Sequence, residues 1–389
     1  MLKKILVIIV ALLALAAVYF NYGKQPPKIT EGISAQQLKS GPYAVTTLDI
    51  DLVDETRKTQ ANGDFAGTDS RTIKTRIWYP KSIETLGKVP LLIYNHGFSS
   101  SRLGGGHIAQ HLASKGYIVA AGDFPLTNIS APGGPLILDV VNQPGDISFI
   151  IDQLLEWNSN DESVFFGHID SARIGIAGLS LGGLTSTLAA FHPDLMDERI
   201  ALVVSIAGPA APFGPRFYEH RADLPTLMLA APEDALVTYA DNALAMKRAN
   251  PNAELVTIEG GSHTGFSAQS TLFRFMNNPD SLACELVMSN LGNDLEGKDW
   301  TDLLGGEEMG LVANAGGRDI CTMNPLPKAM NPVRQQWLTV LAVGSFVESY
   351  FAESEQQRLA NRQYFETTMS AEIPELNVQL KRKLSLRIK

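Results

Sequence analysis

Short apolar runs recur along the middle of the chain, and each is continuous rather than alternating with polar positions. Such continuous runs are typical of strands buried on both faces, as in a parallel sheet. They occupy residues 89–95, 117–123, 173–179, 201–208, 225–231 and 253–259. Segments with a helical pattern lie between them, at about 104–115, 145–157, 181–191 and 238–249. This alternation predicts βαβ units and an α/β fold with a doubly wound, mostly parallel sheet flanked by helices.

The segments on either side of this core have other patterns. Two β-rich segments, 43–53 and 72–80, predict an antiparallel pair ahead of the parallel strands. Residues 267–330 carry clusters of Asn, Gly, Pro and Asp without a strong period, which is typical of a cap or lid. A strongly periodic helix is then expected at 332–351, packed on the sheet.

Near the N-terminus, Lys3 and Lys4 precede an uninterrupted apolar run at residues 5–20. A charged start before an apolar stretch is the pattern of a targeting segment. The run is slightly shorter than the roughly 20 residues that span a bilayer comfortably. We therefore expect residues 1–22 to be a signal peptide or a membrane anchor. The rest of the chain would be exported to a periplasmic or extracellular location, held at the inner membrane if the segment is not cleaved.

The expected domain organisation follows from these patterns. Residues 23–42 are polar and contain prolines, as in a linker, and residues 43–389 form one α/β domain. Within it, residues 267–330 are the expected lid or cap insertion.

Composition narrows the class of protein. The 389 residues are 45% hydrophobic and 19% charged, as in a globular protein with a sizeable core. A net charge of −9 argues against a nucleic-acid partner, because phosphate binding needs a basic face. An exported chain would place its two cysteines, Cys284 and Cys321, in an oxidising compartment, where a disulfide and two free thiols are both open. No Cys/His spacing resembles a metal site, and the sequence does not set the oligomeric state.

The stretch "GLSLGG" places Ser180 between a predicted strand and a predicted helix. A G-x-S-x-G pattern alone is a weak signal, but strand–turn–helix is the setting of a nucleophile elbow. A sharp turn lifts the serine Oγ out of the sheet, and the glycines avoid collisions with neighbouring backbone. The free N–H groups at the helix start are suited to stabilising an oxyanion.

A serine hydroxyl needs a base to become a nucleophile. Of the histidines after Ser180, His263 follows the last buried strand in the glycine-rich loop "IEGGSHTGF" and is the best-placed base. The acid is expected after the preceding strand, where "PEDALV" offers Glu233 and Asp234. We choose Asp234, with Glu233 as a competitor, to accept the second imidazole proton.

The stretch "YNHGF" ends an earlier buried strand and is expected to contribute a second oxyanion donor. The predicted oxyanion site is formed by the backbone N–H groups of Phe98 and Leu181, the latter following the nucleophile. His96 is expected to hold this loop by hydrogen bonds rather than to act as a base.

These motifs, in this order, resemble the α/β-hydrolase superfamily. More narrowly, "YNHGFSSSR", "GDFP" and "DVVNQPGDISFIIDQLL" resemble the serine branch that includes dienelactone-hydrolase-like proteins and platelet-activating-factor acetylhydrolases. The similarity covers about residues 75–266. Dienelactone hydrolases proper use a cysteine nucleophile, so their substrate is not inherited. Relatives usually carry glycine where this chain has Ala231.

The resemblance and the residues together predict a serine carboxylic ester hydrolase that forms an acyl-enzyme. Ser180 would attack a small-molecule or lipid-like ester, with His263 as base and Asp234 as its partner, and with no cofactor. Two alternatives stay open. One is an anchored binding module without catalysis, and the other is an acyltransferase or amidase that uses the same triad.

Overall fold

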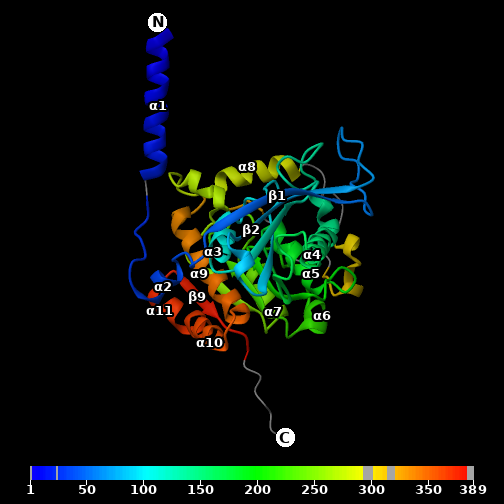
Figure 1. Cartoon of the computed structure of the whole chain (residues 1–389). Helices are drawn as coiled ribbons and strands as arrows, with labels where there is room; N and C mark the ends of the chain where they lie inside the picture. Colours follow the sequence, from blue (N-terminus) through cyan, green and yellow to red (C-terminus); the bar gives the residue numbers. More distant parts are fainter. Residues whose placement is uncertain (1, 23–24, 292–300, 313–319, 383–389) are drawn as a thin grey trace.

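The computed structural model describes residues 2–22, 25–291, 301–312 and 320–382 (Figure 1). These residues contain a nine-stranded sheet in the order β1-β2-β4-β3-β5-β6-β7-β8-β9. Neighbouring strands from β4 to β8 are parallel, whereas β1, β2 and β9 pair antiparallel with their neighbours. The strands are β1 (Val45–Asp54), β2 (Arg71–Pro80), β3 (Val89–Asn95), β4 (Ile118–Asp123), β5 (Ile169–Leu179), β6 (Ile200–Ile206), β7 (Thr226–Ala230), β8 (Glu254–Ile258) and β9 (Leu376–Gln379). The predicted α/β class and mostly parallel sheet are confirmed.

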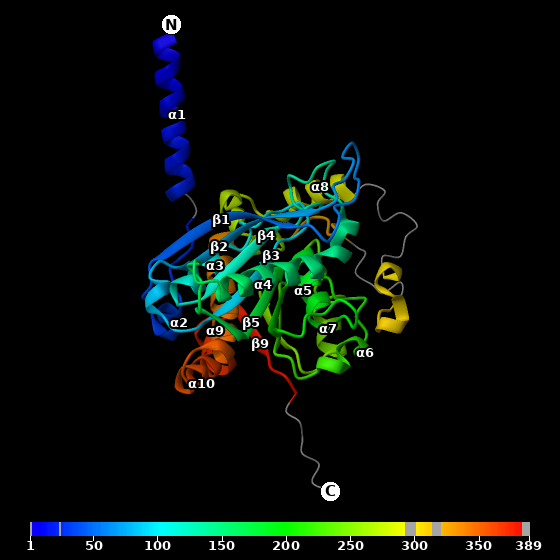
Figure 2. The ribbon, with the colours of Figure 1, turned by 45° about the vertical axis from the view of Figure 1, so that its right-hand side comes forward.

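Helices cover both faces of this sheet (Figures 1 and 2). They are α1 (Leu2–Tyr22), α2 (Gly32–Gln37), α3 (Gly106–Ser114), α4 (Gln143–Ser159), α5 (Leu181–Phe191), α6 (Pro215–Tyr218), α7 (Ala243–Ala249), α8 (Asp280–Leu291), α9 (Pro332–Phe351), α10 (Glu355–Gln363) and α11 (Met369–Glu372). In β3 all seven residues are buried. Leu91 and Ile93 pack on the side of α4 and α5, while Leu92 and Tyr94 pack on the side of α3 and α9. Burial on both faces explains why these strands are continuously apolar.

The helix expected at 238–249 is shorter than predicted, because only Ala243–Ala249 is helical. Before it, Thr238 Oγ1 donates to Asp241, and the Asn242 side chain donates to the Thr238 carbonyl. Short polar side chains that bond nearby backbone or each other compete with helix formation. The apolar pattern does not register this competition.

Residues 23–42, expected as a linker, include helix α2, which packs against the C-terminal part of the chain. The Glu372 carboxylate accepts hydrogen bonds from the backbone N–H groups of Ile33 and Ser34, at 2.9 and 2.7 Å. Tyr364 Oη donates to Ser34 Oγ at 2.9 Å. Helix α2, at the start of the described domain, is therefore hydrogen-bonded to residues near its C-terminal end.

Helix α1 extends away from the sheet and the helices around it (Figure 1). Within the described parts of the chain, no helix combines the length and apolarity needed to cross a membrane.

The expected lid segment contains α8 and three short 3₁₀ helices, Ala268–Phe273, Asp302–Leu304 and Gly306–Met309. Figures 1 and 2 place α8 beyond one end of the strands. Residues 292–300 and 313–319, also within the expected lid, lie outside the described residues. A disulfide joins Cys284 of α8 to Cys321.

Candidate active site

Ser180 occupies a tight turn between β5 and α5, near the middle of the sheet. Its φ of 56° and ψ of −122° lie in a region that residues other than glycine rarely adopt. The turn is held by backbone bonds, since the Ser180 N–H donates to the Ile206 carbonyl at 2.8 Å. The Ser180 carbonyl accepts from the N–H groups of Gly183 and Leu184, at 2.8 and 3.1 Å. A strained serine at the end of a central strand is the geometry of a nucleophile elbow.

Two glycines make this turn sterically feasible. A Cβ at Gly178 would lie 2.1 Å from the Gly182 carbonyl oxygen, and a Cβ at Gly182 would lie 2.1 Å from that of Asn95. Both distances are far inside van der Waals contact. The glycine pattern around Ser180 therefore reflects the close approach of α5 to the ends of the strands.

His263 and Asp234 lie together at the ends of β8 and β7. His263 Nδ1 is 2.7 Å from Asp234 Oδ2, and both side chains are buried, at 6% and 1% exposed. The other carboxylate oxygen of Asp234 accepts from the backbone N–H groups of Leu236 and Val237, at 2.8 and 2.7 Å. These bonds fix the acid and leave Nε2 as the imidazole nitrogen available for chemistry.

Asp280, at the start of α8, joins the two loops that carry this pair. Its fully buried carboxylate accepts from the backbone N–H groups of Ala235, His263 and Thr264, at 3.2, 3.0 and 2.7 Å. Sequence reasoning did not single out Asp280. Its position in the turn cluster "NNPD" was the one available signal, and it gives no indication of the partners.

The charges of His263 and Asp234 act on each other's pKa, against the effect of burial. Burial by itself lowers the pKa of His263, but the charge and hydrogen bond of Asp234, with the nearby Asp280, outweigh burial and raise that pKa above its usual value. The pKa of Asp234 is raised by burial, although His263 and the Val237 N–H act against the rise. Each partner therefore stabilises the charged form of the other.

The competing acid and His192, another histidine that follows Ser180, have other surroundings. The competing acid, Glu233, is half-buried with one carboxylate oxygen unpartnered among the described residues, and burial raises its pKa. His192 Nε2 lies 2.9 Å from the Leu304 carbonyl, and its Nδ1 accepts from the Asp194 N–H. Among the described residues, Asp234 is thus the carboxylate hydrogen-bonded to the imidazole of His263.

The predicted oxyanion loop, residues 96–101, passes close to Ser180. A Cβ on Gly97 would lie 3.2 Å from the Cβ of Ser180. His96 is fully buried; its Nδ1 bonds the Gly97 carbonyl and its Nε2 accepts from the Phe124 N–H, the structural role expected for it. Within the described part of the chain, the N–H groups of Phe98 and Leu181 donate to no protein acceptor.

A cavity of about 520 Å³ opens beside these groups. Ser180, His263, Phe98 and Leu181 all contribute to its wall. Much of the remaining wall is apolar and comes from the loops and from α8, namely Ile129, Ile137, Leu236, Val237, Phe273, Leu282, Ala283, Leu286, Val287 and Ile320. The site therefore combines a few polar groups with a large apolar surface, as small-molecule sites do.

Helix α8 lines one side of this cavity, and two sets of contacts hold it to the rest of the domain. Asp280 binds the loops of the acid and the base, and the Cys284–Cys321 disulfide ties the helix to the segment beside it. The Cys321 N–H also donates to the Ala235 carbonyl at 2.6 Å.

In the described residues, no group of three or more His, Cys, Asp or Glu side chains is placed to hold a metal ion.

Comparison with known proteins identifies the family of this chain and a solved structure with the same fold. The model of the PET hydrolase-like family matches residues 53–277, which include Ser180, Asp234 and His263 and end before α8. No curated protein matches the chain. Among solved structures, a ferulic acid esterase from Streptomyces cinnamoneus has the same fold, with a TM-score of 0.50 and 16% identity over 87% of this chain and 96% of that one. The chain belongs to the PET hydrolase-like family of the α/β-hydrolase superfamily, and it is an ester hydrolase.

Proposed function

We propose that Ser180, His263 and Asp234 form a catalytic triad that hydrolyses carboxylic esters through an acyl-enzyme. The observation that carries this proposal is the 2.7 Å hydrogen bond between His263 and Asp234. His263 lines the same cavity as Ser180, which lies on a strained turn. A base oriented by a buried acid, next to a partly exposed serine, is the arrangement that activates a hydroxyl.

Acylation begins when Ser180 Oγ attacks the ester carbonyl and His263 Nε2 takes the hydroxyl proton. The imidazolium that forms is stabilised by Asp234, whose carboxylate stays ionised. The tetrahedral intermediate then collapses, the C–O bond to the alcohol breaks, and His263 returns the proton to the leaving alcohol. Water attacks the acyl-enzyme in the same way, which releases the carboxylic acid and restores Ser180.

The oxyanion of each tetrahedral intermediate is held by the backbone N–H groups of Phe98 and Leu181. Among the described residues neither N–H has a protein acceptor, and Leu181 lies at the start of α5; both observations support this role. The contribution of one such donor is on the order of 3 kcal/mol of transition-state stabilisation.

The acyl group occupies the apolar part of the cavity under α8. The wall there is formed by aliphatic side chains and Phe273, so a hydrocarbon or aromatic acyl group gains more on transfer from water than a charged one. The segment 267–330 thus acts as a lid that sizes the pocket. Its deletion should broaden the range of acyl groups accepted, and it should also lower kcat because it removes Asp280.

Hydrolysis of p-nitrophenyl esters, from acetyl to dodecanoyl, tests the proposal. The protein of residues 25–389 should turn them over, and Ser180→Ala should lower kcat at least about a thousandfold. A fluorophosphonate probe should label the unmodified protein at Ser180 and leave the variant unlabelled. Equal activity of the two proteins would remove Ser180 from the mechanism.

A further inference from the structure

The two halves of the proposed oxyanion site belong to parts of the chain that are far apart in sequence. Leu181 begins helix α5, whereas Phe98 lies in the oxyanion loop after β3. At the base of this loop, Asn95 Nδ2 donates to Ser186 Oγ of α5 at 2.8 Å. Phe98 is three residues further out, so its position relative to Leu181 depends on contacts beyond β3.

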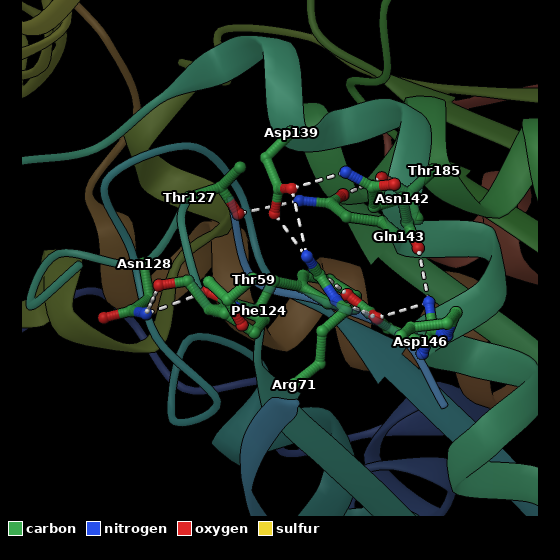
Figure 3. A network of polar contacts seen from close by, with 12 residues as sticks. Thr59, Arg71, Phe124, Thr127, Asn128, Asp139, Asn142, Gln143, Asp146 and Thr185 are labelled. Atoms are coloured by element: carbon green, nitrogen blue, oxygen red, sulfur yellow. Dashed lines mark hydrogen bonds and ion pairs between the residues drawn. The ribbon is translucent and has the colours of Figure 1, made fainter. Parts of the chain in front are cut away.

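A buried hydrogen-bonded chain supplies such a contact (Figure 3). Gln143 Nε2 donates to Thr127 Oγ1 at 2.7 Å, and the Thr185 hydroxyl donates to Gln143 Oε1. Thr127, Gln143 and Thr185 are all fully buried. An amide bridges two hydroxyls in either orientation, because each hydroxyl can donate or accept.

Each end of this chain reaches one half of the oxyanion site. Thr185 Oγ1 lies 2.9 Å from the carbonyl oxygen of Leu181, one turn earlier in α5. At the other end, the Thr127 carbonyl accepts from the N–H of Ser99, the residue after Phe98, at 2.9 Å. Gln143 therefore sits between the two donors, one hydrogen-bonded residue away from each.

The position of Gln143 is itself fixed by an ion-paired frame. The buried guanidinium of Arg71 makes two bonds to Asp146, at 2.8 and 2.7 Å, and two to Asp139, at 3.2 and 3.0 Å. These two carboxylates flank Gln143 in the chain, and Asn142 also bonds Asp139 at 2.7 Å. Figure 3 shows this frame beside the Gln143 bridge.

We propose that Gln143 is a positioning residue that sets the spacing of the two oxyanion donors through the hydrogen-bonded chain Thr127–Gln143–Thr185. The proposal rests on the triad mechanism above and adds a residue that does not touch the substrate. Because donors act on charge that develops in the transition state, a change in their spacing affects kcat rather than KM.

Gln143→Met is the first test, since methionine has a similar length and makes no such bridge. We expect kcat per labelled Ser180 to fall about 10- to 100-fold, with KM unchanged within about twofold. The affinity for an alkylboronic acid, which forms a tetrahedral adduct on the serine, should fall by a similar factor. A lower fraction of labelled sites with unchanged kcat per site would indicate only a folding role and overturn the proposal.

Two threonines of α5 provide a matched pair. Thr185→Val should lower kcat as Gln143→Met does. Thr185→Ser keeps the hydroxyl, so it should have a kcat close to that of the unmodified protein. Thr187 is also buried and bonds the carbonyl one turn earlier, Gly183, at 2.9 Å, so Thr187→Val removes a similar bond without touching the bridge. We expect Thr187→Val to keep the kcat of the unmodified protein.

The double variant Gln143→Met/Thr185→Val should be no slower than either single variant, because both remove the same bridge. Additive losses would overturn the proposal. Unchanged kcat in both single variants, with Ser180→Ala inactive, would overturn it while leaving the triad intact. Activity that survives in Ser180→Ala would overturn the triad and this inference together.

Discussion

In the proposed triad, His263 must be neutral to take the proton of Ser180, so its pKa would set the acidic limit of activity. That pKa is raised above its ordinary value of 6.5, because Asp234 outweighs the effect of burial. The imidazole therefore protonates at a higher pH than usual, and activity is lost as the pH falls through this raised value.

We expect kcat/KM to rise with pH through a single step above pH 6.5, the ordinary value for histidine. Asp234→Asn removes the carboxylate, so burial should then dominate and move the step to lower pH. The plateau should fall at least about a thousandfold, because the imidazolium loses its partner. A pH profile of both proteins measures the step, and one that does not move in Asp234→Asn would contradict the assignment of the acid.

Asp280 supports the His263–Asp234 pair through the backbone of the loops that carry it. Its carboxylate accepts three backbone N–H groups, whereas an asparagine would place an NH₂ group against at least one of them. We expect Asp280→Asn to lower the free energy of unfolding by about 2–3 kcal/mol and to lower kcat, because the loops of the acid and the base lose their common acceptor.

Urea unfolding and ester hydrolysis check both effects. Asp152→Asn is the control, since the Asp152 side chain is 58% exposed and pairs with Arg199 at the surface. That substitution should change stability by no more than about 0.5 kcal/mol. Equal behaviour of the two variants would show that Asp280 does not brace the site.

At the scale of elements, the sequence predicted best where one physical effect dominates. Strands β3 to β8 were recognisable because burial on both faces demands unbroken apolar runs. The elbow was recognisable because α5 approaches the strands too closely for a side chain at Gly178 or Gly182. In both cases the constraint lies within a few consecutive residues.

Other features were not predictable, because their constraints do not lie within a few consecutive residues or leave no pattern in the sequence. Strand β9 has four residues, only one of them buried, at the edge of the sheet, so it has no apolar pattern. Asp280 binds backbone N–H groups, and these carry no signature in the sequence. The Gln143 bridge joins residues that are 16 and 42 positions apart, and only the folded chain brings them together.

Helix α8 gives a prediction about selectivity. The Cys284–Cys321 bond closes a separation of 37 residues, for which loop entropy predicts a contribution to stability of about 3–4 kcal/mol. Cys284→Ser/Cys321→Ser should lower stability by up to this amount. It should also reduce the preference between short and long acyl esters, because α8 is then held mainly at Asp280.

The rates for acetyl and dodecanoyl esters, measured with and without reductant, test this effect. Reductant should change the selectivity of the unmodified protein and leave the double variant unaffected. An equal response in both proteins would assign the effect to something other than the disulfide.

At the scale of the whole molecule, the two ends of the α/β domain stabilise each other. Helix α2 is bonded to Glu372 and Tyr364, and the Gly41 N–H donates to Ser114 Oγ at 2.8 Å. A chain that begins at Tyr43 loses all of these contacts, whereas one that begins at Gln25 keeps them. Export and anchoring through residues 5–20 stay predictions from the sequence.

We expect the chain from Tyr43 to melt about 2–5 °C below the chain from Gln25. Glu372→Ala in the longer chain should reproduce part of the loss, since it removes the acceptor for α2. Thermal unfolding at a fixed protein concentration checks both. Equal Tm values for the two chains would mean that residues 25–42 contribute nothing to the domain.

The position of α8 also matters for directed evolution. Four of its side chains, those of Leu282, Ala283, Leu286 and Val287, face the cavity, whereas Asp280 faces the base and Cys284 forms the disulfide. A library randomised at the four cavity positions, with residues 280 and 284 held constant, would sample new substrate preferences without disturbing proton transfer at His263. If the proposed mechanism holds, the positions of α8 that contact the substrate and the position that supports the base are separate and interleaved on a single helix, so they can be varied independently.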